Sequence, residues 1–187
     1  MIDLLCCFRT KDHPIWLNKK FHLDLKWWAH VLDQWHGASF WLFHCLSLAV
    51  DIEVASYAAA SFGVATYFRG FWFTGRWVAS LLSQSIAYQE LFPVVVAAHV
   101  FGTQWSRKHV LFRSDNEAVV HMLNSKTSRT PSLITLLRSL LLCAARYSFS
   151  FSSQNIPGVN NLIADSLSRF HWQGLQQLAP EEQHVPT

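Results

Sequence analysis

Cysteines, acidic residues and long apolar runs are all scarce in this sequence of 187 residues, and each scarcity excludes some classes of protein. The 4 cysteines form no Cys-x-x-Cys pair and the 10 histidines form no His-x-x-x-His pair. Neither a zinc site nor a redox motif is therefore indicated. We expect free, mostly buried thiols in a reducing compartment.

No segment of the sequence has the pattern of a membrane span or an export signal. The most apolar stretch, residues 39–50, is too short to cross a bilayer and contains His44. The N-terminus has no basic region ahead of an apolar run and no small-residue cleavage site. We therefore expect an intracellular protein of the cytoplasm or nucleus that has no membrane partner.

Apolar residues, by contrast, make up 51% of the chain and include 9 tryptophans. This composition predicts a packed globular protein, and the length suffices for one domain with an attached piece. The formal net charge of +3 is compatible with nucleic-acid binding but does not require it, because no dense block of Lys and Arg occurs. A slightly basic surface without such a partner is the more common case.

The character of the sequence changes near Gly37. Before this point, Asn18 occupies the position of a helix N-cap, and Gly37 itself is a plausible helix stop. Between them, apolar side chains recur at helical spacing, at Phe21, Leu25, Trp28, Leu32 and Trp35. Such a stripe favours core packing over a base-stacking platform, because helices of globular proteins bury this kind of face.

Strand and helix patterns alternate after Gly37. Strand character is found in five runs, at 51–56, 62–68, 71–77, 109–115 and 147–153. Residues 57–61 are expected to link the first two runs, and Arg69-Gly70 to form a tight turn. Helical patterns cover 85–101, 116–123, a segment starting near Pro131, and 161–170. This order predicts an α/β fold in which a five-stranded mixed sheet carries helices on both faces.

Three acidic residues occupy informative positions. Glu90 lies near the start of the long central helix, Asp115 at the end of the fourth strand, and Asp165 in the last helix. Each has an ordinary alternative: Glu90 could interact with the helix dipole, Asp115 could cap the next helix, and Asp165 could be a solvated surface residue. Side chains from a strand end and from two helices that cover it can nevertheless converge, and converging carboxylates bind Mg²⁺.

The sequences around these residues resemble those of a known family. Four segments occur in the family's order: FWFTGRW at 71–77, YQELFP at 88–93, RSDNEAVV at 113–120 and IPGVNNLIADSLSR at 156–169. Together they resemble the ribonuclease H domain of retroelement polyproteins, most closely that of DIRS-like retrotransposons. The resemblance implies a ribonuclease H-like fold with four carboxylates around two Mg²⁺ (or Mn²⁺) ions, which cleaves the RNA strand of an RNA–DNA hybrid. Glu90, Asp115 and Asp165 match the second, third and fourth carboxylates.

The resemblance covers nearly the whole chain and implies three parts. Residues 1–42 resemble the connection that follows a reverse transcriptase, residues 43–174 resemble the ribonuclease H domain, and residues 175–187 are expected to form a flexible tail. Neither a Tyr-x-Asp-Asp polymerase motif nor a recombinase Arg…His-x-x-Arg…Tyr set is found. We therefore expect the chain to be a piece of such a polyprotein.

Tyr57 stands at the position of the family's first catalytic aspartate. Glu53 and Asp51 share its strand face but lie roughly 13 and 20 Å away, so neither can replace a carboxylate there. A neutral phenol, with a pKa of about 10, is a poor Mg²⁺ ligand. We expect metal binding and nuclease activity to be weakened or lost. Asn155, where the family often has His, is a smaller departure.

Three functions are compatible with the sequence. The leading one is a weakened or inactive ribonuclease H domain that still recognises an RNA–DNA hybrid or another nucleic acid. The second is a working hybrid nuclease that tolerates Tyr57. The third, of a different class, is a domesticated module that binds nucleic acid or a protein without cleaving it.

Overall fold

The computed structural model describes residues 16–33, 50–59, 62–157 and 168, which belong to two compact units, Met1–Ala38 and Ser39–Thr187. In the first unit, α2 (Lys19–Asp33) begins where the sequence predicts. Asn18 Oδ1 accepts a hydrogen bond from the backbone N–H of Phe21 at 2.9 Å, so Asn18 is the N-cap. The expected stop at Gly37 lies outside the described residues.

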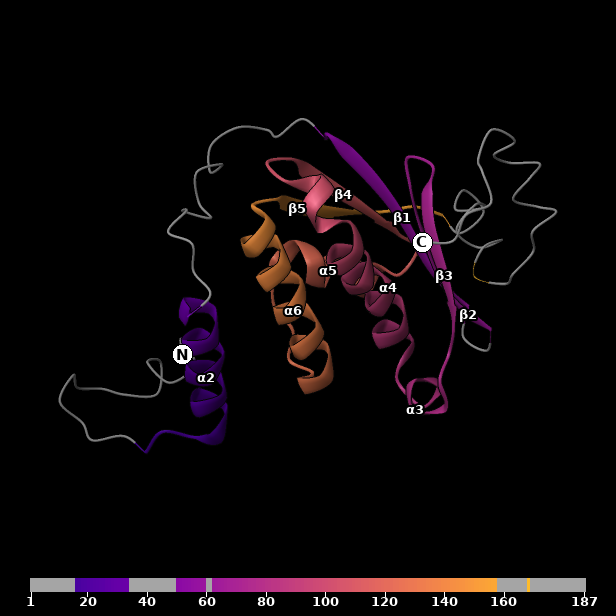
Figure 1. Cartoon of the computed structure of the whole chain (residues 1–187). Coiled ribbons are helices and arrows are strands. Elements are labelled where there is room, and N and C mark those ends of the chain that lie inside the picture. Colours follow the sequence, from indigo (N-terminus) through magenta and orange to yellow (C-terminus); the bar gives the residue numbers. More distant parts are fainter. Residues whose placement is uncertain (1–15, 34–49, 60–61, 158–167, 169–187) are drawn as a thin grey trace. The chain divides into compact units, whose positions relative to one another are not determined.

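The second unit is built on a five-stranded sheet with the order β3-β2-β1-β4-β5 (Figure 1). The strands are β1 (Ile52–Ala59), β2 (Gly63–Phe68), β3 (Phe71–Arg76), β4 (His109–Ser114) and β5 (Ser150–Asn155). Strands β1, β2 and β3 form an antiparallel meander, whereas β4 is parallel to β1 and β5 is parallel to β4. This topology confirms the predicted α/β fold with a five-stranded mixed sheet.

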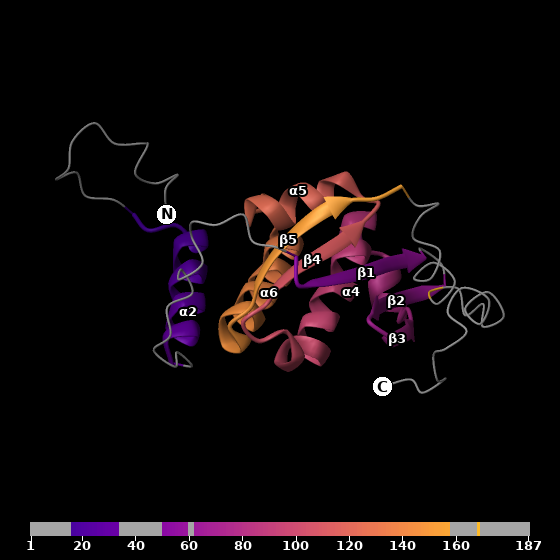
Figure 2. The ribbon, with the colours of Figure 1, turned by 90° about the horizontal axis from the view of Figure 1, so that it is seen from above.

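Three helices cover one face of this sheet, namely α4 (Ile86–Phe101), α5 (Glu117–Ser125) and α6 (Pro131–Tyr147) (Figure 2). Two short helices, α3 (Ala79–Leu82) and η1 (Gly102–Trp105), were not anticipated from the sequence. The helix expected at 161–170 falls outside the described residues except for Ser168, which is fully buried.

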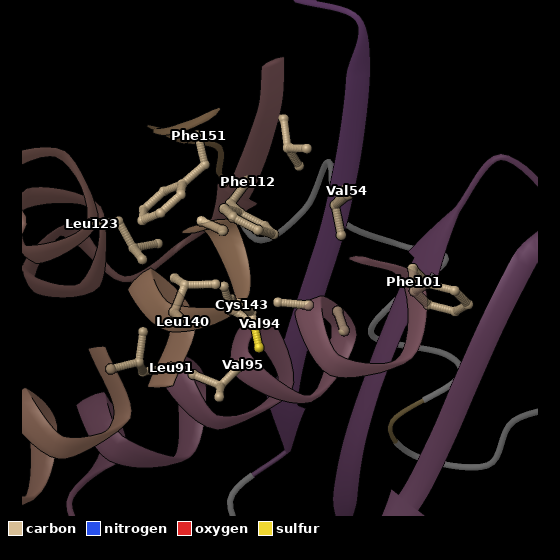
Figure 3. Packing of buried hydrophobic residues seen from close by; sticks show 14 of the residues in the cluster. Val54, Leu91, Val94, Val95, Phe101, Phe112, Leu123, Leu140, Cys143 and Phe151 are labelled. Carbon is tan, nitrogen blue, oxygen red and sulfur yellow. The ribbon is translucent and has the colours of Figure 1, made fainter. Parts of the chain in front are cut away.

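The hydrophobic core lies between the sheet and these helices (Figure 3). Val54 of β1 and Phe112 of β4 point from the sheet toward Leu91 of α4 and Leu140 of α6, and all four side chains are fully buried. Burying each such side chain contributes roughly 1.5–3 kcal/mol relative to its exposure. The core therefore fixes α4 against β1, which determines where residues near the start of α4 lie.

Helix α4 is the most apolar element of the unit. By length and composition alone, the continuous stretch Ile86–Trp105 could cross a membrane, but more than half of it is buried within the unit. Pro93 lies in the interior of α4, not near its first residue, and its carbonyl accepts a hydrogen bond from Thr66 Oγ1 at 3.3 Å. These contacts are those of a central core helix packed on a sheet.

Two strand boundaries differ from the prediction by three residues, and the others by at most two. Tyr57 to Ala59 continue β1, because β2 provides a partner for each of them and pairs Tyr57 with Ala65. Strand β5 begins at Ser150 instead of residue 147, because α6 continues through Tyr147 and ends where Ser148 adopts a left-handed conformation with φ of 55°. Pairing in the first case and a helix cap in the second override the local propensity.

The ring of Tyr147 explains a glycine at the start of η1. A Cβ atom on Gly102 would lie 2.4 Å from a carbon of the Tyr147 ring, so no larger residue fits unless the ring moves. This close approach joins the last turn of α6 to the segment that leads into β4.

Candidate carboxylate site at the carboxyl ends of β1 and β4

The carboxyl ends of β1 and β4 lie side by side, because the two strands are parallel neighbours. Their register pairs Ala55 with Arg113, and Tyr57 and Asp115 each follow two residues farther along the chain. Side chains of β1 alternate between the buried face that α4 covers and the opposite face. Tyr57 is half-buried and belongs to the second set.

Asp115 follows β4 directly and precedes α5. The N-cap of α5 is Asn116, whose Oδ1 accepts hydrogen bonds from the N–H groups of Ala118 and Val119 at 3.0 and 3.2 Å. The alternative role of Asp115 as the helix cap is therefore wrong. Asn155, at the end of β5, donates from Nδ2 to the carbonyl oxygen of Asp115 at 3.4 Å.

Glu90 reaches the same edge from α4. Ser85 caps this helix by accepting a hydrogen bond from the Tyr88 N–H at 3.3 Å, which leaves Glu90 in the second turn with only 5% of its surface exposed. Among the described residues, no hydrogen-bond partner is found for Oε2 of Glu90. Glu90 is thus a buried carboxyl with one oxygen that has no hydrogen-bond partner among the described residues.

The surroundings of Glu90 raise its pKa to about 8. Burial is the largest cause, because it disfavours the charged form, and the negative charge of Asp115 raises the pKa further. A hydrogen bond with the backbone of Ala58 acts in the opposite direction and lowers the pKa. Glu90 and Asp115 are therefore close enough for the charge of one to affect the other, and their predicted role in a common site stays a prediction.

A divalent cation would match this pair of carboxylates. An unpartnered buried oxygen next to a second negative charge is unfavourable by itself, and a cation between the two groups would remove both penalties. Within the described ranges, however, no group of three His, Cys, Asp or Glu side chains converges. Asp165 lies outside those ranges, so its predicted place in the site stays a prediction.

The backbone beside Tyr57 is held in place by two side chains. The neighbouring Ala58 forms the hydrogen bond with Glu90, and the carbonyl oxygen of Ala59 accepts a hydrogen bond from Trp77 Nε1 at 2.8 Å. The sequence motifs contain Trp77 and Asn116, but they do not reveal these contacts. Two side chains from outside β1 therefore bind its backbone next to position 57.

Comparisons with known proteins concern the fold. No family model and no curated protein matches the sequence. Among solved structures, the chain is similar to ribonuclease H1 from the archaeon Halobacterium salinarum, with 14% identity, a TM-score of 0.45, and coverage of 65% of this chain and 97% of that one. It is also similar to the N-terminal RNase H domain of a Mycobacterium tuberculosis protein, with 13% identity, a TM-score of 0.43, and coverage of 69% and 99%. LC11-RNase H1, solved in complex with an RNA/DNA hybrid, gives 14% identity, a TM-score of 0.46, and coverage of 65% and 97%.

Proposed function

We propose that residues 43–174 are a ribonuclease H-like domain from a retrotransposon reverse transcriptase polyprotein, whose ancestral reaction is cleavage of RNA in an RNA–DNA hybrid. The single observation that supports this most directly is the buried carboxyl of Glu90, whose pKa is raised by burial and by the charge of Asp115 after β4. Structural proteins rarely bury a carboxyl with an unpartnered oxygen beside a like charge, whereas metal-dependent sites do. The four sequence motifs around these residues support the same assignment.

In this proposal Glu90, Asp115 and Asp165 bind Mg²⁺ or Mn²⁺. A bound divalent ion would supply Lewis-acid activation of a phosphodiester and a water of lowered pKa. The protein's own contribution is to orient the ligands: the Ala58 backbone holds Glu90, and Asn155 holds the backbone of Asp115. Glu90 must lose its proton to bind a cation, so its raised pKa makes metal binding stronger as the pH rises.

Tyr57 weakens the proposed site. The phenol takes the place next to Asp115 where the family has a carboxylate, and a neutral phenol contributes little to cation binding. A site with three carboxylates should bind one ion and hold a second ion weakly or not at all. Cleavage then loses much of the charge stabilisation that two ions provide, and the rate should fall by orders of magnitude.

Replacement of Tyr57 by Asp tests this proposal. We expect Y57D to cleave a labelled RNA–DNA hybrid in the presence of Mg²⁺ or Mn²⁺, while the unmodified chain cleaves it far more slowly or not at all. The substitution removes a half-buried ring, so a loss of about 1–3 kcal/mol in stability is expected, which a folded domain of this size should tolerate. Circular dichroism should confirm that both proteins are folded.

Two results would contradict the assignment. If folded Y57D stays inactive with either metal, one substitution does not explain the loss, and the site has changed more widely. If the unmodified chain already cleaves at a normal rate, Tyr57 does not disable it. Y57D combined with D115N is the matched control, because it keeps the restored carboxylate and removes its neighbour.

Tyr57 also favours one second candidate, a domesticated module that binds nucleic acid or a protein without cleaving it. A domain used only for binding has no need of the first carboxylate. Hybrid binding by the unmodified chain, combined with no metal-induced stabilisation and no activity in Y57D, would support this candidate over the first.

A further inference from the structure

The end of the sheet away from the carboxylates is rich in cations. Strands β1, β4 and β5 start there, and β2 turns into β3. Four basic residues lie at this end, three in the turns and one in the last turn of α6, and we call this set the basic end: Arg69, Arg107, Lys108 and Arg146. Arg69, Arg107 and Arg146 are exposed, and Lys108 is half-buried.

Hydrogen bonds join the Arg69 turn to the start of β4. Arg69 Nη2 donates to the carbonyl oxygen of Asp51 at 2.6 Å. The N–H of Asp51 donates to the carbonyl oxygen of His109 at 3.1 Å, and Asp51 Oδ2 accepts from the His109 N–H at 2.7 Å. Arg69 therefore lies close to the segment that contains Lys108.

A second set of contacts brings Arg146 to the same segment. The N–H of Arg107 donates to the carbonyl oxygen of Ser148 at 2.9 Å, and this bond connects the turn before β4 to the end of α6. Arg146 lies in the last turn of α6, with its guanidinium 5.8 Å from the centroid of the Tyr147 ring. Because that ring rests on Gly102, the two turns have a fixed relation to each other.

Negative charge near these cations is largely engaged in other contacts. Asp51 uses one carboxylate oxygen to accept the His109 N–H, and Glu53, farther along β1, forms an ion pair with Arg113 at 3.0 Å. His109 adds little positive charge near neutral pH, because burial and the charge of Lys126 lower its pKa. The basic end therefore carries a net positive charge, whereas Glu90 and Asp115 lie at the other end of the parallel strands.

We propose that the basic end binds the phosphodiester backbone of nucleic acid, as a second contact surface separate from the carboxylate site. This inference rests on the proposed function for the expectation that nucleic acid is the partner. Three of the four cations are arginines, whose planar guanidinium matches the geometry of phosphate oxygens. Fixed turns that present such groups suit contact with a backbone without reading of base sequence.

The test is the salt dependence of hybrid binding by the full chain. A fluorescein-labelled RNA–DNA hybrid is titrated in EDTA, so that neither metal binding nor cleavage contributes, at NaCl concentrations from about 50 to 200 mM. The variant is R107Q/R146Q; Arg69 is kept because its guanidinium holds Asp51. The matched control is R129Q/R138Q, which removes the same charge from the segment just before α6 and from the middle of that helix.

Each contact with a phosphate that a substitution removes lowers the slope of log Kd against log salt concentration by about 0.9. We therefore expect R107Q/R146Q to lower the slope by roughly two and to weaken binding at the lowest salt by about tenfold or more, while R129Q/R138Q changes both far less. Equal losses in the two variants would overturn the proposal, because affinity would then follow net charge alone. Tighter binding to phosphatidylserine vesicles than to the hybrid would also overturn it.

Failure of this inference can be distinguished from failure of the proposed function. If Y57D cleaves the hybrid but R107Q/R146Q binds it like the unmodified chain, only the proposal that the basic end binds nucleic acid is wrong. If Y57D is inactive but binding still depends on Arg107 and Arg146, the basic end is supported and the nuclease assignment is not. If the folded, unmodified chain does not bind the hybrid at all, the proposal for the basic end is wrong.

Discussion

The raised pKa of the buried Glu90 carboxyl makes the stability of the protein depend on pH. The pKa of this carboxyl is raised above the unfolded value of 4.5 to about 8, so the folded protein retains a proton that the unfolded chain releases between these two pH values. The folded state therefore binds more protons in this window, and the free energy of unfolding falls as the pH rises through it. Below about pH 4.5 the carboxyl is protonated in both states, and this destabilisation is absent.

Replacement of Glu90 by Gln should remove this pH dependence. Gln has nearly the same shape and carries no charge, so in EDTA we expect E90Q to be more stable than the unmodified chain at pH 8, by roughly 2 kcal/mol. The difference should disappear near pH 4.5. Urea unfolding at several pH values measures it directly.

A divalent cation should make the unmodified chain more stable than E90Q at pH 8, the opposite of the order expected in EDTA. At pH 8, Mg²⁺ or Mn²⁺ should raise the Tm of the unmodified chain and leave that of E90Q almost unchanged, because only the former has the Glu90 carboxylate. E117Q is the matched control, since Glu117 is a neighbouring carboxyl in the first turn of α5. Equal metal-induced shifts in E90Q and the unmodified chain would show that Glu90 is not a ligand.

The sequence predicted the elements that carry Glu90 and Asp115, the start of α4 and the end of β4, and their place in one site stays a prediction from the flanking motifs. It could not show that Asn116 caps α5, since Asp115 and Asn116 are both suitable cap residues and only the backbone geometry selects between them. The raised pKa of Glu90 was equally inaccessible, because it depends on packing between α4 and β1. Asp165 stays a prediction from its motif.

At the scale of elements, the outer edge of β5 is closed by side chains from the end of α5. Asn124 pairs with the backbone of Ser153: its Nδ2 donates to the carbonyl oxygen and its Oδ1 accepts the N–H, both at 2.8 Å. Lys126 Nζ donates to the carbonyl oxygens of Phe151 at 2.8 Å and Leu123 at 2.6 Å. These bonds satisfy backbone groups that an edge strand would otherwise leave open to another chain.

Substitution of Asn124 by Ala should therefore destabilise the domain. Two backbone groups of Ser153 lose their partner, and we expect a loss of about 1–3 kcal/mol in the free energy of unfolding, together with faster aggregation on heating. Equilibrium unfolding in urea and light scattering give the two readouts. The neighbouring S125A serves as control, because Ser125 makes a single long hydrogen bond of 3.5 Å within α5. Similar effects of N124A and S125A would argue against edge closure.

The close contact between Gly102 and the Tyr147 ring predicts the effect of a substitution at the junction of α4 and η1. G102A should destabilise the domain by about 1–3 kcal/mol, because the added Cβ meets the ring and shifts either η1 or the end of α6. In a Tyr147→Leu background the same substitution should cost much less, which a double-mutant cycle measures. Equal costs in both backgrounds would show that the ring is not the obstacle.

The boundaries of elements were harder to predict than their order. The alanines after Tyr57 have low strand propensity, and only their pairing with β2 extends β1. At residues 147–149 the alternation of side chains suggested a strand, but packing of Tyr147 on Gly102 extends α6. Both differences come from contacts between distant segments, which periodicity within one segment cannot report.

For the whole molecule, the fold class followed from the order of strands and helices. Three successive strands followed by alternating helices and strands predicted the mixed sheet, and the motif resemblance suggested the arrangement that β1 and β4 adopt. The position of the segment before residue 39 relative to the sheet could not be derived from residue patterns. Residues 1–38 form a separate compact unit by internal contacts.

Removal of the N-terminal segment tests whether it stabilises the main domain. We predict that residues 1–36 act as an accessory helix of the main domain, because a segment of this length is too short to bury a core of its own. A chain beginning at residue 38 should then have a lower Tm and expose more apolar surface, as measured by dye binding. Limited proteolysis that releases a stable 38–187 fragment with an unchanged Tm would contradict the prediction.

The hydrogen bond between Glu90 and the Ala58 backbone has a consequence for the history of this chain. A main-chain partner is present whatever side chain occupies position 57, so under the proposed function an exchange of Asp for Tyr there would leave Glu90 in place. Codons for Asp and Tyr differ by one base, and selection could therefore cross this step in either direction without rebuilding the scaffold. A lineage that silenced its nuclease in this way would keep it within reach of a single reversion.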